Sequence, residues 1–391
     1  MADLPKTADF VILGAGVMGT SIAFQLARRK AGTIAILDKD HVGRGGSGRS
    51  SGLIRMHYSY PPEVQLALIS LSIFQRWQHY VGAPGDFRQI GFVRIVHPND
   101  TEKLKRNVDL QRRVGVEVML IGQDELRELE PDWNVDDVTI AAYEPDSGYG
   151  DGAGVANDFL NRARELGVTY LPRTQATGLR VESGRVLAVM TDQGEIATQA
   201  VVVAMGPWTR PLLQRVGLDV PIETEFHQVA ILKNAAGMKG GGCACIDSAT
   251  GTYFRSDGPD KFLVGDFYGP RPVDPDNFQQ RPSEAELEPL IERASRRIPK
   301  LENAEVMRGV TGVYDMTPDS RPLLGAVPEI SGLYLCAGFS GMGFKISPAV
   351  GLVMSELLLD GRNTIMDISP FRPSRFAEGE PIIAPYEYKD D

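Results

Sequence analysis

The stretch DFVILGAGVMGTSIAFQLARR, from Asp9 to Arg29, decides the fold of this chain. It begins with a short apolar run, continues through a turn rich in glycine and ends in a segment with apolar residues at helical spacing. A second apolar run, TIAILDKD at 33–40, follows directly. Strand, helix and strand in this order form a βαβ unit, whose crossover connection predicts a parallel sheet.

The glycines of the turn follow the pattern G-x-G-x-x-G at Gly14, Gly16 and Gly19. The first makes the tight turn, the second lets the backbone approach a pyrophosphate, and the third permits close packing of helix on strand. Asp38 ends the next strand, where a carboxylate accepts hydrogen bonds from a ribose. The pattern predicts a dinucleotide site; a tight turn without ligand is the alternative. The adjoining residues predicted to bind the cofactor are Ala15, Val17, Met18 and Lys39.

Three further segments indicate a flavin rather than a nicotinamide dinucleotide. They are GRGGSGRSSG at 43–52, VVVAMGPW at 201–208 and GFSGMGFK at 338–345. The last predicts a second helix start, with Pro348 in the first turn, and its dipole would stabilise an anionic reduced flavin. For 201–208 alone, a core strand with a turn is an equal reading. The cofactor-binding residues predicted here are Gly46, Ser47, Arg49, Ser50, Ser51, Gly52, Ala176, Ala204, Gly206, Trp208, Gly338, Phe339, Gly341, Gly343, Phe344 and Lys345.

The order of expected strands and helices along the rest of the chain predicts a mixed α/β (α+β) fold. In this fold a Rossmann-like nucleotide-binding domain is interleaved with a β-sheet domain. We assign residues 1–88, 149–219 and 320–391 to the first domain, and 89–148 and 220–319 to the second. The segment 61–81 predicts one long amphipathic helix. Strands between 169 and 206 are separated by predicted turns at Ser183-Gly184 and Gln193-Gly194.

Composition limits the classes of partner. The net charge of −10 disfavours nucleic acid, which normally binds a basic surface. Three cysteines are too few for a disulfide framework, so reduced thiols are expected. No apolar run reaches the roughly 20 residues that span a bilayer, and the start lacks the pattern of a signal peptide. We therefore expect a cytoplasmic protein without a membrane span; the oligomeric state is not determined by these features.

A family resemblance follows from VILGAGVMG, GSGRSSGLIRMHY, AMGPW, RGVTGVYDMTPDSRPLLG and AGFSGMGFKISPAVG. Together these motifs resemble the FAD-dependent amine oxidoreductases of the D-amino-acid-oxidase superfamily. The nearest branch holds monomeric sarcosine oxidase, glycine oxidase and the dimethylglycine or sarcosine dehydrogenases. The resemblance spans about residues 9–372. It implies an FAD domain with a substrate domain that covers the flavin.

By this resemblance, Arg55 and Lys345 hold the carboxylate of a small amino acid, while Tyr253 and Tyr314 line the substrate cavity. Arginine offers a planar fork and lysine a point charge, which together fix the carboxylate and aim the neighbouring C–H bond. Two cations also favour the neutral form of the amine, so no separate base is expected. The implied reaction oxidises a secondary amino acid such as sarcosine or iminodiacetate, or a primary one, to an imine that water hydrolyses.

Several positions depart from the family pattern or leave alternatives. Gly312 stands where monomeric sarcosine oxidase tethers its flavin through cysteine, so noncovalent FAD is expected. Leu263 stands where that enzyme has an oxygen-activating lysine, which leaves O2 or another acceptor, such as a quinone or flavoprotein, open. Lys261 lies two residues away on the same strand face. Two arginines, Arg255 and Arg321, either lie on the surface or bind a second substrate carboxylate. Two histidines, His57 and His227, are interpreted as structural residues.

Two other functions are compatible with the same motifs. One is a flavoprotein without turnover that serves in assembly, and retention of both Arg55 and Lys345 argues against it. The other is an RNA-modifying oxidoreductase, against which the acidic balance argues.

Overall fold

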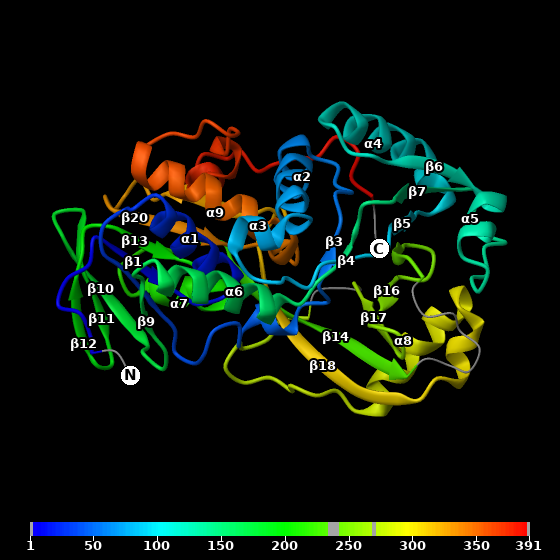
Figure 1. Cartoon of the computed structure of the whole chain (residues 1–391), viewed down its shortest axis with the longest axis horizontal. Coiled ribbons are helices and arrows are strands. Elements are labelled where there is room, and N and C mark those ends of the chain that lie inside the picture. Colours follow the sequence, from blue (N-terminus) through cyan, green and yellow to red (C-terminus); the bar gives the residue numbers. More distant parts are fainter. Residues whose placement is uncertain (1–2, 234–241, 268–270, 389–391) are drawn as a thin grey trace.

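The computed structural model of the chain describes residues 3–233, 242–267 and 271–388. It contains two large sheets lying side by side, each covered by its own helices (Figure 1). The first has six strands in the order β19-β20-β13-β1-β2-β9, all parallel except for the β19–β20 pair. Its strands are β1 (Phe10–Leu13), β2 (Ile34–Leu37), β9 (Thr169–Leu171), β13 (Val201–Val203), β19 (Leu323–Ala326) and β20 (Leu333–Ala337).

Both faces of this sheet are buried, which explains its continuous apolar strands. Ile12 and Ile36 lie in one core cluster with residues of α1 (Val17–Arg28), α6 (Gly152–Glu165) and α9 (Gly343–Asp360). Leu13 and Leu37 lie in a second cluster with a three-stranded sheet on the other side. The strands of that sheet are β10 (Ala176–Glu182), β11 (Arg185–Thr191) and β12 (Gly194–Ala197).

The second large sheet has eight strands in the order β18-β14-β17-β16-β15-β5-β7-β6. Apolar side chains of α8 (Glu284–Arg297) cover one face, while the other carries Tyr253 and Leu263. Its strands are β5 (Phe92–Ile95), β6 (Met119–Gly122), β7 (Ile140–Glu144), β14 (Glu223–Lys233), β15 (Ala244–Asp247), β16 (Thr252–Ser256), β17 (Lys261–Asp266) and β18 (Val306–Met316). The predicted mixed α/β fold with a Rossmann-like unit is confirmed.

Short elements complete the chain. A small sheet joins β3 (Leu53–Ile54), β8 (Gly148–Tyr149) and β4 (Arg88–Gln89) at the junction of the two large sheets. The remaining helices are α2 (Pro61–Phe74), α3 (Trp77–Val81), α4 (Thr101–Val114), α5 (Gln123–Leu129) and α7 (Thr209–Gln214). None of the helices in the described ranges combines the length and apolarity needed to cross a membrane.

The six-stranded sheet draws its strands from 10–37, 169–203 and 323–337, and the eight-stranded sheet from 92–144 and 223–316. We propose the boundaries 1–88, 149–219 and 320–391 for the cofactor domain, with 89–148 and 220–319 as the substrate domain. Residues 1–2, 234–241, 268–270 and 389–391 of these ranges lie outside the described residues.

The expectation of one long amphipathic helix over 61–81 is wrong. The helix breaks after Phe74, and the chain turns so that Trp77 stacks on Phe74 and donates its indole N–H to Asp158 of α6. The helix is also buried on more than one side, since it packs against both α9 and α4. A buried helix has no need of a polar face.

Pro348 does not lie in the first turn of its helix, because α9 begins at Gly343. A proline inside a helix leaves the carbonyl four residues earlier without its backbone donor. Here the hydroxyl of Ser347 donates to that carbonyl, of Phe344, at 2.8 Å. The predicted turn at Ser183-Gly184 is present, whereas the second turn falls one residue earlier than predicted, at 192–193.

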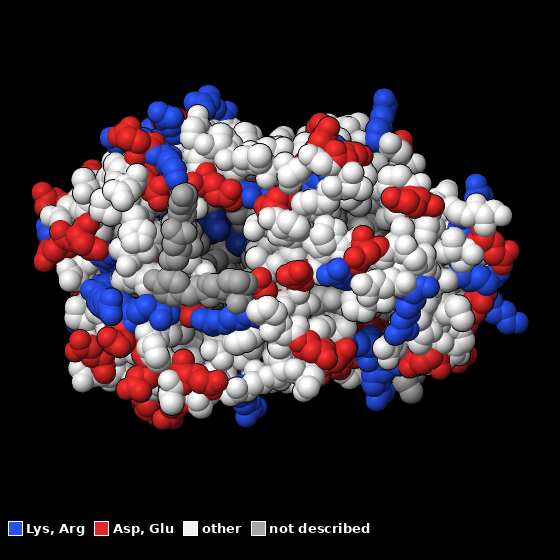
Figure 2. Space-filling model, turned by 180° about the vertical axis from the view of Figure 1, so that it is seen from behind, with Lys and Arg blue, Asp and Glu red and all other residues white. Residues whose placement is uncertain are grey.

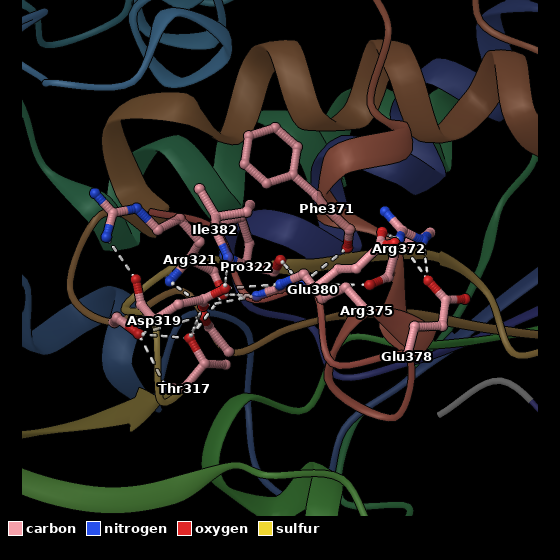
Figure 3. A network of polar contacts seen from close by, with 12 residues as sticks. Thr317, Asp319, Arg321, Pro322, Phe371, Arg372, Arg375, Glu378, Glu380 and Ile382 are labelled. Atoms are coloured by element: carbon pink, nitrogen blue, oxygen red, sulfur yellow. Dashed lines mark hydrogen bonds and ion pairs between the residues drawn. The ribbon is translucent and has the colours of Figure 1, made fainter. Parts of the chain in front are cut away.

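The C-terminal segment is fixed by one buried ion pair (Figure 3). Arg375 has 0% exposure, and its guanidinium donates to both carboxylate oxygens of Asp319 at 2.8 Å. It also donates to the carbonyl oxygens of Pro322 and Arg321. The backbone N–H of Ile382 donates to the same Asp319 carboxylate, so the pair holds the final stretch against the fold.

We predict that Arg375→Leu lowers the free energy of unfolding by about 3–5 kcal/mol, because it leaves the Asp319 carboxylate buried without its partner. Arg372→Leu is the matched control, since its ion pairs with Glu378 and Glu380 are partly exposed and are expected to contribute little. Urea unfolding of both variants measures the difference. Equal unfolding midpoints for the two variants would contradict the role given to this pair.

Candidate active site

A cavity of about 510 Å³ opens at the carboxyl ends of the parallel strands. Leu13, Leu37 and Ala204 line it at or just beyond the ends of β1, β2 and β13. Open α/β sheets bind ligands at this edge, where the strand order reverses. The position of the cavity therefore follows from the topology of the sheet.

Most of the residues predicted to bind the cofactor form the wall of this cavity. They come from five segments that are distant in sequence, and the cavity brings them together. They are Gly14, Gly16, Val17, Met18, Asp38, Lys39, Gly46, Ser47, Arg49, Ser50, Ala176, Ala204, Gly206, Trp208, Phe339, Gly341, Gly343 and Phe344.

Five other residues predicted to bind the cofactor do not line the cavity but lie next to residues that do. The N–H of Ala15 donates to Asp38 at 2.8 Å, and the N–H of Gly338 donates to Asp315 at 2.6 Å. Ser51 accepts from Arg255 through its carbonyl oxygen. A Cβ atom at Gly19 or Gly52 would overlap a neighbouring carbonyl oxygen, of Gly14 and Gly150 respectively. These residues shape the backbone around the cavity.

The turn after β1 tolerates no side chain at its first glycine. Gly14 has φ +101°, and a Cβ there would overlap the carbonyl oxygen of Ala204 at the end of β13. At Gly16 a Cβ would come within 3.0 Å of the Ser47 hydroxyl, which itself accepts from the N–H of Val17 at 3.0 Å. The turn, β13 and the 43–52 segment thus lie in close contact around the cavity.

Two helices, α1 and α9, begin at the cavity, and neither has a side-chain hydrogen bond from its N-cap residue, although the Ser47 hydroxyl accepts the first N–H of α1, that of Val17. Free first-turn N–H groups and the positive end of a helix dipole suit phosphates and an anionic ring. The Asp38 carboxylate is largely buried, and this burial raises its pKa above the usual value, against the effect of hydrogen bonds from the N–H groups of Asp40 and Ala15. These features fit FAD: one helix start for the pyrophosphate, the other for the flavin.

The sequence did not predict that the segment 274–280 would also line the cavity. Asp276 pairs with Lys39 at 2.5 Å and accepts the indole N–H of Trp208 at 2.9 Å. The ammonium of Lys39 lies 3.9 Å from the centre of the Trp208 ring. The segment lies in the chain between β17 and α8 and carries no periodic pattern. Only the tertiary structure therefore shows that it lines the cavity.

Arg55 and Lys345 both lie near the ring of Tyr58, beside the cavity rather than in its wall. The Arg55 guanidinium lies 4.5 Å from the Tyr58 ring centre, and the Lys345 ammonium lies 6.0 Å from it. Lys345 is 7% exposed, and its nearest acceptor, the carbonyl oxygen of Gly341, is 3.5 Å away. Gly341 itself lines the cavity. Both cations therefore lie near one tyrosine ring, and Lys345 is also next to the cavity wall through Gly341.

Burial lowers the pKa of Lys345 well below its usual value, and the charge of Arg55 adds to this effect, while Glu63 opposes it. Arg55 donates to the carbonyl oxygen of His57, and its Nε has no hydrogen-bond partner within the described structure. A carboxylate placed between Arg55 and Lys345 would satisfy both groups. Figure 2 shows a hollow in the face seen from behind, with Lys or Arg side chains in its depth.

The two predicted tyrosines lie next to one another. Tyr314 lines the cavity and stacks on His227, with ring centres 4.1 Å apart. Its hydroxyl is hydrogen-bonded to that of Tyr253, and burial raises the pKa of both phenols. Gly265 makes room for Tyr253, because a Cβ there would overlap the phenol ring.

The surface location expected for Arg255 and Arg321 is wrong, because both are buried. Arg255 pairs with Asp257 at 2.8 Å, and Arg321 pairs with Glu63 at 3.2 Å and Glu387 at 2.9 Å. The sequence analysis did not predict any of these three acids as a partner of the two arginines.

The buried His57 stacks on Tyr388, and its Nε2 lies 2.8 Å from that hydroxyl. Its surroundings agree with a structural role, and burial holds its pKa well below the usual value.

The glycine turn gives a direct test of cofactor binding. We predict that Gly14→Ala purifies with less than about a tenth of the FAD of the parent protein, because the added methyl displaces the turn from β13. Gly167→Ala is the control: its φ is also +101°, but nothing lies within 4 Å of an added Cβ. Flavin absorbance per protein, measured beside thermal unfolding, separates lost binding from lost folding. Equal FAD content in both variants would refute the assignment.

The chain matches the family model "FAD dependent oxidoreductase" (DAO) over residues 9–357. It is 27% identical to mouse (Mus musculus) FAD-dependent oxidoreductase domain-containing protein 1, covering 97% of this chain and 86% of the relative. It is 27% identical to glycine oxidase of Geobacillus kaustophilus, covering 94% and 97%. Among solved structures, L-proline dehydrogenase from P. horikoshii superposes with a TM-score of 0.90 at 28% identity, covering 97% and 100%. The chain is a member of the DAO family of FAD-dependent oxidoreductases.

Proposed function

We propose that this enzyme oxidises a small amino acid, with a secondary amine of the N-substituted glycine type as the preferred class. The product is an imine, which water hydrolyses to an oxoacid or aldehyde and an amine. The observation that carries the proposal is that the cations of Arg55 and Lys345 lie 4.5 Å and 6.0 Å from the centre of the same ring, that of Tyr58, beside the FAD cavity. The names of the glycine oxidase and L-proline dehydrogenase relatives support this substrate class.

The residues have distinct roles in this proposal. Arg55 and Lys345 hold the substrate carboxylate, which fixes the neighbouring C–H bond toward the cavity. Tyr314 and Tyr253 close the space beside it and exclude water. FAD, when bound, supplies the two-electron acceptor. The two cations favour the neutral amine, whose lone pair must be free as the C–N bond gains double-bond character.

The pairing of the neighbouring arginines supports a substrate with one carboxylate. Arg255 and Arg321 each face an acid of the chain, so a second carboxylate, as in iminodiacetate, would have to displace Asp257, Glu63 or Glu387. Of these pairs, Arg321–Glu63 is buried on both sides, and removing one partner of such a pair leaves an uncompensated buried charge. Sarcosine and proline therefore fit this site better than iminodiacetate does.

The surroundings of the flavin site support noncovalent FAD and an acceptor other than O2. Gly312 occupies the tether position, and burial raises the pKa of the cavity-lining Cys336, which keeps it an unreactive thiol. Leu263 lies in an apolar cluster with Tyr253, so the position of the oxygen-activating lysine carries no charge. We propose a dehydrogenase that passes electrons to a quinone or a flavoprotein.

A cytoplasmic location is also proposed, because Cys243, Cys245 and Cys336 are all free and buried thiols. A role in RNA modification is disfavoured by the face in Figure 2, where acidic and basic side chains are interspersed.

We predict that the holoenzyme bleaches under nitrogen with at least one of sarcosine, proline, glycine or dimethylglycine, and less readily with iminodiacetate. Lys345→Met weakens the apparent affinity for the best substrate about 10- to 100-fold, the effect of one lost charge-assisted hydrogen bond. Stopped-flow absorbance of the flavin measures both values. Lys105→Met, an exposed lysine on α4, serves as the control.

Unchanged reduction in Lys345→Met would refute the carboxylate clamp. A holoenzyme that no amino acid bleaches would instead support the flavoprotein without turnover. Admitting air after reduction tests the acceptor, since fast reoxidation would identify an oxidase.

A further inference from the structure

The last described stretch of the chain, 384–388, belongs to no motif of the sequence, yet its backbone is held in place by α4 (Figure 1). The side-chain amide of Asn107, a fully buried residue of α4, donates to the carbonyl oxygen of Tyr386 at 2.9 Å. One turn earlier on the same helix, the Lys103 ammonium donates to the carbonyl oxygen of Glu387 at 3.0 Å. These contacts fix the course of the backbone up to the tyrosine that follows.

That tyrosine, Tyr388, contacts two buried side chains, His57 and Arg94. Its ring stacks on the His57 imidazole, with centres 5.8 Å apart and planes inclined by 16°. Its hydroxyl lies 2.8 Å from Nε2 of the same imidazole. The guanidinium of Arg94, on β5, lies 4.7 Å from the centre of the Tyr388 ring. A residue from the C-terminal stretch is therefore part of the interior beside β5.

His57 is also the residue that holds the Arg55 side chain. Nη1 of the Arg55 guanidinium donates to the carbonyl oxygen of His57. Both residues pack on Phe92, whose ring centre lies 5.7 Å from the guanidinium carbon of Arg55 and 6.4 Å from the centre of the imidazole. A single residue, His57, therefore contacts both Tyr388 and Arg55.

The orientation of the His57 ring depends on Tyr388. Glu144, a fully buried residue of β7, accepts the backbone N–H of Met56 at 2.9 Å and so fixes the chain next to His57. It does not orient the imidazole, because its Oε1 lies 3.8 Å from Nδ1, and Nδ1 has no hydrogen-bond partner within the described structure. The imidazole is thus oriented through Nε2, by the Tyr388 hydroxyl.

We propose that Tyr388 is a positioning residue for substrate binding: its ring and hydroxyl hold His57, and the carbonyl oxygen of His57 holds the Arg55 guanidinium in place for the substrate carboxylate. The proposal rests on the carboxylate clamp of the proposed function. An arginine fork must be aimed to bind a carboxylate with two hydrogen bonds, and a side chain that is already ordered loses less conformational entropy on binding. The C-terminal stretch thus contributes to substrate affinity through His57 and Arg55.

The test measures binding of methoxyacetate, a carboxylate without an amine to oxidise, to the holoenzyme through the visible flavin spectrum. We expect Tyr388→Ala to bind it about tenfold more weakly than the parent, since the aromatic contact and the hydrogen bond are both lost. Tyr388→Phe keeps the ring and should bind about threefold more weakly, the effect of one hydrogen bond. Both variants should keep the FAD content of the parent, because Tyr388 does not line the cofactor cavity.

Two comparisons show whether the loss passes through Arg55. Tyr386→Phe is the matched control: it removes a hydroxyl from the same stretch, but its ring lies over Arg106 of α4, at 5.8 Å, and its binding curve should follow the parent. Arg55→Met removes the side chain that His57 holds. In that background Tyr388→Ala should cause little further loss, because two changes to one interaction are not additive.

The outcomes separate failure of this inference from failure of the proposed function. If Arg55→Met binds methoxyacetate as the parent does, the clamp itself is wrong. If Arg55→Met binds weakly but Tyr388→Ala binds normally, the clamp stands and the role of Tyr388 is refuted. An equal loss from Tyr388→Ala in the parent and in Arg55→Met also refutes it, because the tyrosine then acts on the fold and not through Arg55. If Tyr388→Ala loses FAD, Tyr388→Phe decides, and binding equal to that of Tyr386→Phe overturns the inference.

Discussion

Burial of charge is the constraint on which this structure depends. Lys345, Glu63, Arg321, Asp319 and Arg375 are all buried, and a charge removed from water must meet an opposite charge or a set of hydrogen-bond donors or acceptors. Arg375 meets this requirement fully, with the Asp319 carboxylate and several carbonyl oxygens around its guanidinium. Lys345 does not, because its nearest acceptor is a distant carbonyl oxygen. The difference separates the structural cation Arg375 from Lys345, which we propose binds a ligand.

The two kinds of cation are connected. Arg321 donates to Glu387 and faces Glu63, while its own carbonyl oxygen accepts from Arg375. The C-terminal segment, fixed by Arg375, thereby reaches the region beside the clamp. Because opposite charges alternate along this path, a change at any one position alters the electrostatic balance of its neighbours.

Local patterns predicted the nucleotide-binding turn well, since its physical causes are local. Gly14 needs a positive φ, and Asp38 ends a strand that pairs directly with β1. The break after Phe74 and the position of Pro348 could not be predicted in this way. The first depends on a contact of Trp77 with α6, and the second on a hydroxyl that replaces a missing backbone donor. The burial of Arg255 likewise depends on the carbonyl oxygen of Ser51, a contact between β16 and the loop that precedes β3.

The sequence by itself determined the βαβ unit, the two helix starts that suit FAD, and the residue types of a carboxylate clamp, because glycine spacing and apolar periodicity act within a few residues. Only the tertiary structure brought Arg55 and Lys345 to the same ring, that of Tyr58, added 274–280 to the cavity, and paired Glu63 with Arg321. The physical reason is that a side chain's charge and its burial cost are set by neighbours in space. Those neighbours come from elements that no short-range pattern connects.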